Sequence, residues 1–74
     1  MSKKIELFGH DNCPACKLLK KYFEDNNIVF DYIDVFKDQC YAVDNDVRGV
    51  PHVIIGGVPF VAPTLQQVKN VLEF

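Results

Sequence analysis

The chain has 74 residues, of which 49% are hydrophobic and 24% are charged, and its net charge is −2. This length fits one compact domain over residues 1–74, and the composition excludes a largely disordered chain. The negative charge argues against a nucleic-acid binder, and the sequence has no apolar run near the ~20 residues that cross a bilayer.

The first half of the chain predicts a strand followed by a helix. A short apolar strand, Ile5–Phe8, ends at Gly9, and from Pro14 the apolar residues recur at helical spacing. The helix is expected to close at residues 25–27, because asparagine tolerates the left-handed conformation that ends many helices. Five apolar residues share its predicted buried stripe: Ala15, Leu18, Leu19, Tyr22 and Phe23.

The middle of the chain predicts a strand, a short helix and another strand. Residues 28–35 are rich in β-branched and aromatic side chains, as strands are. A weaker pattern over residues 37–45 indicates a short helix. Residues 50–55 contain an unbroken apolar run, which is typical of a strand buried on both faces.

The last third predicts a hairpin and a helix. Gly56 and Gly57 form a two-residue hairpin signal, and Pro59 places the returning strand, residues 58–61, at a sheet edge because proline cannot donate to a ladder. Residues 64–67 have the capping-box form that opens a helix. The order β-α-β-α-β-β-α predicts an α/β fold, with a four-stranded mixed sheet flanked by three helices and a right-handed parallel unit at its start.

The Cys13-Pro14-Ala15-Cys16 segment is the candidate site. By spacing alone, such a pair is half of a zinc site, a redox couple or two unrelated buried residues. Zinc needs four ligands, and the other candidates (Cys40, His10 and His52) show no paired spacing, so we expect no metal. Redox chemistry is the better interpretation.

The redox interpretation requires a thiolate nucleophile, and Cys13 is placed to become one. It precedes the first helical turn, Pro14 suits the first helical position, and the unpaired N–H groups of that turn favour negative charge on the sulfur. Lys17 adds positive charge four residues later. Cys16 lies one turn deeper on the same side, as a resolving thiol would.

Val50-Pro51 is the second half of the predicted site. An X-Pro step before a buried strand suits a cis bond, and the Val50 backbone could pair with an extended substrate as an added strand. The alternative is an ordinary proline at a strand start. Cys40 is expected to pack beneath the second helix, since free cysteine is commonly buried.

Three segments together resemble the glutaredoxins, within the thioredoxin fold: Cys13–Cys16, Arg48–Pro51 and Val53–Gly57. The resemblance implies a reductase of protein disulfides and glutathione mixed disulfides, with glutathione as reducing co-substrate and no bound cofactor. It implies that Cys13 and Cys16 are catalytic. The residues expected to contact glutathione or substrate are Pro14, Ala15, Lys17, Arg48, Val50 and Pro51.

Three positions depart from the glutaredoxin pattern. The segment Val58–Phe60 directly after Gly57 has no acidic residue, His10 stands where the family often has lysine, and Ala15 replaces an aromatic residue. These departures leave open a second function, in which thioredoxin reductase supplies electrons that the protein passes to ribonucleotide reductase. The third possible function is that of a non-catalytic module that binds zinc or an iron–sulfur cluster.

Three cysteines without a signal peptide do not resemble a disulfide framework. We therefore expect a cytoplasmic protein. We also expect a monomer and, from the charge and the lack of a long apolar run, neither nucleic-acid nor membrane partners.

Overall fold

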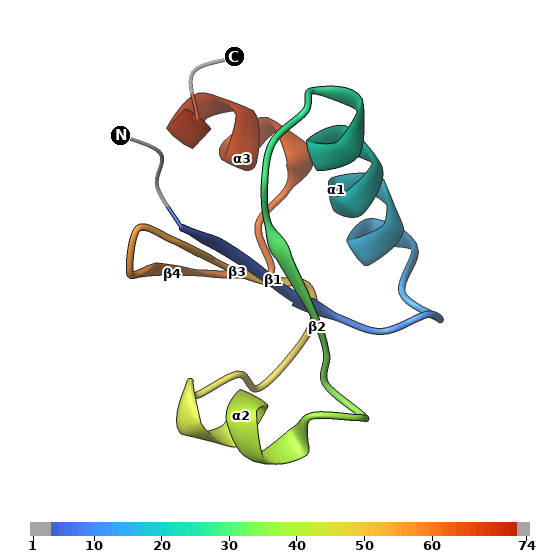
Figure 1. The fold of residues 1–74 in the computed structure, drawn as a ribbon, viewed down its shortest axis with the longest axis vertical. Coiled ribbons are helices and arrows are strands. Elements are labelled where there is room, and N and C mark those ends of the chain that lie inside the picture. The colour runs from blue at the N-terminus through green and yellow to red at the C-terminus, as the bar shows by residue number, and fades with distance from the viewer. Residues whose placement is uncertain (1–3, 73–74) are drawn as a thin grey trace.

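The computed structural model describes residues 4–72 (Figure 1). The predicted order of elements is confirmed. The elements are β1 (Ile5–Gly9), α1 (Pro14–Asp25), β2 (Asp31–Asp34), α2 (Gln39–Asp44), β3 (His52–Ile55), β4 (Val58–Val61) and α3 (Leu65–Leu72). None of these helices is both long and apolar enough to cross a membrane.

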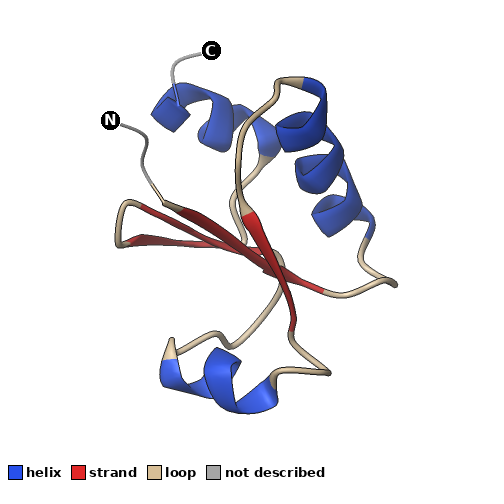
Figure 2. Ribbon diagram, viewed as in Figure 1, coloured by secondary structure: helices blue, strands red, loops and turns tan. Residues whose placement is uncertain are grey.

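The four strands form one mixed sheet in the order β2-β1-β3-β4. β1 pairs parallel with β2 and antiparallel with β3, and β4 pairs antiparallel with β3 at the edge. Figure 2 shows α1 and α3 on one face of the sheet and α2 on the other. The predicted four-stranded sheet with helices on both faces is therefore confirmed.

The core has two layers because side chains alternate between the faces of each strand. On the face of α1 and α3, seven residues form the larger cluster: Ile5, Leu7, Leu19, Phe23, Val53, Ile55 and Val68. On the face of α2, the smaller cluster consists of Phe8, Ile33 and Ala42. The large apolar layer holds α1 firmly, and α1 carries the candidate thiols.

The buried stripe of α1 differs from the prediction. Cys16, Leu19 and Phe23 are buried, whereas Ala15 is exposed and the Leu18 side chain is 59% exposed. The helix is rotated so that Cys16 faces the sheet, and this turns Leu18 toward solvent. The predicted stripe is confirmed for Leu19, Tyr22 and Phe23 and wrong for Ala15 and Leu18, because the Cys16 thiol took a core position.

β2 is shorter than predicted, since residues 28–30 and Val35 lie outside it. Ile28 donates its N–H to the Phe23 carbonyl at 2.8 Å, which closes the end of α1 instead of extending the sheet. Ile28 and Phe30 still pack on the larger core cluster. The apolar composition was therefore right about the burial of Ile28 and Phe30, but Val29 is exposed and the segment makes no strand pairing.

The two local signals of the last third are confirmed. Gly56 and Gly57 both adopt positive φ, 58° and 85°, in the turn between β3 and β4. At the start of α3, Gln67 donates its N–H to Thr64 Oγ1 at 3.1 Å, and Thr64 donates its N–H to Gln67 Oε1 at 2.8 Å. This reciprocal pair is the capping box that the sequence predicts.

A candidate redox site at the start of helix α1

Cys13 occupies the N-cap of α1. Its backbone is extended, with φ −103° and ψ 107°, and its Sγ accepts the N–H of Cys16 at 3.2 Å. The first turn holds no acidic side chain that would compete for the positive end of the helix. An N–H donor and a helix N-terminus both favour negative charge on the atom they face. The side chain is 8% exposed, so this sulfur lies just beneath the surface.

Cys16 lies one turn further into the fold and is only 1% exposed. Burial raises the pKa of its thiol to about 12, and a side-chain hydrogen bond with Cys13 adds to this effect. Cys16 is therefore a neutral thiol at physiological pH. Both cysteines are free thiols in this structure. One sulfur at a helix N-terminus and a second, protonated sulfur behind it can carry out the two successive steps of thiol–disulfide exchange.

Gly9 and Tyr32 form the wall behind Cys16, and the sequence reasoning missed both. A Cβ at Gly9 would lie 2.7 Å from the Cys16 Sγ and 3.4 Å from the Tyr32 hydroxyl. The last residue of β1 can therefore lie beside the Cys16 thiol only if it is glycine. The sole signal in the sequence was a glycine between a strand and the Cys13 turn; Tyr32 gave none.

Val50-Pro51 contains a cis peptide bond, as the sequence predicts. His52 pairs with Phe8, so the chain enters β3 beside the end of β1, from which the loop to Cys13 departs. The carbonyl of Pro51 accepts the N–H of Ala62 at 2.9 Å. Within residues 4–72, neither the N–H nor the C=O of Val50 has a backbone hydrogen-bond partner.

The other predicted contact residues lie on the surface. Pro14, Ala15 and Lys17 are exposed on the first turn of α1. Arg48 is also exposed, and its Nε lies 3.2 Å from the Asp46 carboxylate. The structure thus places the three helix residues beside the thiols and gives Arg48 a different partner.

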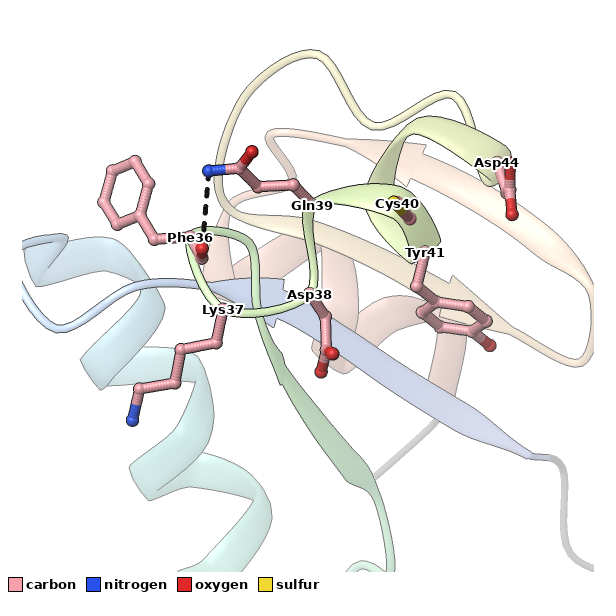
Figure 3. A pocket seen from close by; sticks show the side chains of 7 residues that line it. All are labelled: Phe36, Lys37, Asp38, Gln39, Cys40, Tyr41 and Asp44. Carbon is pink, nitrogen blue, oxygen red and sulfur yellow. Dashed lines mark hydrogen bonds between the residues drawn. The ribbon is translucent and has the colours of Figure 1, made fainter.

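Cys40 is exposed, which corrects the expectation that it packs beneath α2. α2 presents Ala42 to the sheet, and two residues earlier the helix faces away. Figure 3 shows Cys40 among the residues of a surface pocket built entirely from the segment 36–44. None of the residues predicted for the thiol site lines this pocket.

The structure does not assemble the ligands of the zinc hypothesis. Residues 4–72 contain no group of three or more His, Cys, Asp or Glu side chains that could hold a metal ion. His10 instead packs against the Phe36 ring at a tilt, with centroids 4.9 Å apart, and its Nδ1 accepts the Asn12 N–H at 3.2 Å. His52 is 2% exposed and meets the Phe8 ring edge to face.

His52 makes stability depend on pH. Both ring nitrogens are buried without a hydrogen-bond partner among the described residues. Burial lowers the pKa of His52 below its ordinary 6.5, and the Asp46 carboxylate opposes this only in part. The unfolded chain therefore binds the proton more readily, so the free energy of unfolding should fall as the pH drops below about 6.5.

Urea unfolding of the native chain and of His52→Leu, measured between about pH 5 and pH 7.5, checks this prediction. The native chain should lose stability toward the acid end, and the variant should show a flatter profile. Parallel profiles for the two proteins would contradict it.

The comparisons with known proteins identify a family and a fold. The family model described as Glutaredoxin matches residues 5–61, which is more than half of the chain. A search of curated protein sequences gave no match.

Similar solved structures share the thioredoxin-like fold. A mutant of the thioredoxin-like protein BC3987 is 26% identical, with a TM-score of 0.81 over 93% of this chain and 94% of that one. Thioredoxin 1 from Thermosipho africanus is 29% identical, with a TM-score of 0.75 over 95% and 90%. The glutaredoxin-like NrdH-redoxin from Escherichia coli is 22% identical, with a TM-score of 0.70 over 80% and 82%.

Proposed function

The chain belongs to the glutaredoxin family, a group of thioredoxin-like redox proteins, and from this premise we propose that it is a dithiol–disulfide oxidoreductase that uses Cys13 and Cys16. The observation that carries the proposal is the 3.2 Å hydrogen bond from the Cys16 N–H to the Cys13 Sγ at the N-cap of α1. It supplies a donor to the sulfur that must carry negative charge, while the second sulfur remains protonated behind it.

The reaction proceeds in two exchanges. The Cys13 thiolate attacks a substrate disulfide, forms a mixed disulfide and releases one substrate thiolate, which takes a proton from water. Cys16 loses its proton and attacks the Cys13 sulfur, so that the Cys13–Cys16 disulfide forms and the second substrate sulfur leaves as a thiol. Two electrons pass from the protein to the substrate, and an external thiol must then reduce the protein again.

Glutathione is the proposed reductant, and protein disulfides and glutathione mixed disulfides are the proposed substrates. The N–H and C=O of Val50, which have no backbone partner among the described residues, support this, because an extended glutathione or peptide backbone could pair with them as another strand. Lys17, exposed on the first turn of α1, supplies a positive charge for a carboxylate. Pro14 and Ala15 would line the approach to Cys13.

A second candidate reductant is thioredoxin reductase, with ribonucleotide reductase as the acceptor. The observation in its favour is the segment after Gly57, where the exposed Val58 and Pro59 offer no carboxylate to a glutathione amino group. Arg48 also meets Asp46 rather than an open site. Both features weaken the recognition of glutathione by charge.

Loss of NADPH in two parallel assays separates the two reductants. One contains glutathione and glutathione reductase, the other thioredoxin reductase, and both contain the same small disulfide substrate. The proposal expects turnover in the glutathione assay. Turnover only with thioredoxin reductase would replace glutathione by the second candidate, and no turnover in either would contradict the oxidoreductase proposal.

A further inference from the structure

The second exchange has a chemical difficulty that the Cys13 geometry does not resolve. Cys16 is 1% exposed, and burial is the main reason why its thiol retains the proton. In the mixed disulfide Cys13 is neutral, so its hydrogen bond and charge no longer oppose ionisation of Cys16. The desolvation of Cys16 remains. A buried thiolate needs a hydrogen-bond donor to replace the water that it has lost.

The Tyr32 hydroxyl group lies near the Cys16 sulfur. The point where a Gly9 Cβ would lie is 2.7 Å from the Cys16 Sγ and 3.4 Å from the Tyr32 hydroxyl. The sulfur and the hydroxyl therefore border the same small space at the end of β1. Tyr32 comes from β2, where it pairs with Leu7, two residues before Gly9.

Tyr32 is held in its protonated state, in which its hydroxyl can donate a hydrogen bond. Burial raises the pKa of its hydroxyl, and negative charge on Cys16, Asp11, Asp34 or Cys13 raises it further. The group therefore stays protonated when a thiolate forms beside it. The ammonium of Lys20, from α1, lies 4.9 Å from the centre of the Tyr32 ring, where its attraction to the ring face helps to fix the ring.

We propose that the Tyr32 hydroxyl donates a hydrogen bond to the Cys16 sulfur as it becomes a thiolate, which makes Tyr32 a positioning residue for the second exchange. The inference rests on the proposed function. It adds a residue from β2 to a site otherwise built from α1 and the Val50-Pro51 segment. The proton of Cys16 leaves with the departing substrate thiol, and Tyr32 keeps its own proton throughout.

The test follows the two exchanges separately with 5,5′-dithiobis(2-nitrobenzoate), one equivalent per reduced protein, in a Cys40→Ser background that removes the exposed third thiol. Attack by Cys13 releases the first coloured thiolate, and attack by Cys16 on the mixed disulfide releases the second. Tyr32→Phe retains the ring beneath Lys20 and removes only the hydroxyl.

We expect Tyr32→Phe to slow the second release by about tenfold or more while the first keeps its rate, since a hydrogen bond to a charged sulfur is lost. The rise of the second rate with pH should also move to higher pH. If Tyr32 had only a structural role, its substitution would change neither the ratio of the second release rate to the first nor the pH dependence of the second.

Tyr22→Phe is the matched control. Tyr22 also lies beneath a lysine, with the Lys69 ammonium 5.5 Å from its ring centre, and its hydroxyl is buried without a partner among residues 4–72. The Tyr22→Phe variant should release both coloured thiolates at the parent rates. A second release in Tyr32→Phe within about twofold of the parent rate would overturn the inference while the first release still supports the proposed function. If the parent protein released neither coloured thiolate, the proposed function itself would be overturned.

Discussion

Replacing Cys13 with serine should lower disulfide reduction by at least about 10³-fold, because the hydroxyl that replaces the sulfur is not ionised at neutral pH. The fold should survive. Cys13 is the N-cap of α1, and serine is among the residues that cap helices best, since its oxygen accepts the same N–H that the sulfur accepts now. The loss of activity is measured as NADPH consumption with a small disulfide, and thermal unfolding confirms that the variant is folded.

Two further variants make this result specific. Cys40→Ser removes an exposed thiol outside the site and should keep full activity. Cys16→Ser should stop after the first exchange and accumulate a mixed disulfide on Cys13, visible as added mass. If Cys13→Ser remained fully active and Cys40→Ser did not, the chemistry would belong to the exposed thiol of α2.

Local signals were sufficient for most of the fold and for the thiol pair. The capping box at Thr64, the Gly56-Gly57 turn and the Val50-Pro51 step each act within a few residues, so the sequence alone predicted them correctly. Cys13 belongs to this group as well, because a strand, a turn and Pro14 define where α1 begins. Such features need no knowledge of what packs against them.

The errors came from contacts between distant segments. Periodicity showed that α1 is amphipathic, yet it could not show that Cys16 rather than Leu18 would face the sheet. Cys40 seemed a core residue by type, but α2 is one short helix that buries only Ala42. The contact between Gly9 and Tyr32 depends on the parallel register of β1 and β2, which no local pattern encodes.

Gly9→Ala should damage the site through packing alone. The added Cβ would lie 2.7 Å from the Cys16 Sγ and 2.9 Å from its Cβ, closer than real Cβ contacts permit. Because Leu19 and Phe23 anchor α1 in the core, the helix cannot simply move away. We expect a loss of about 1–3 kcal/mol in the free energy of unfolding, as for other overpacked cores.

The same substitution should slow the second exchange more than the first, because it displaces Cys16 and fills the space shared with Tyr32. Gly49→Ala is the matched control, since a Cβ there meets nothing within 4 Å. Urea unfolding and the two-step release of coloured thiolate, measured on both variants, give the comparison. Equal stability and equal second rates in the two variants would show that the end of β1 does not hold Cys16 in place, and the wall behind the thiol would then have no part in the chemistry.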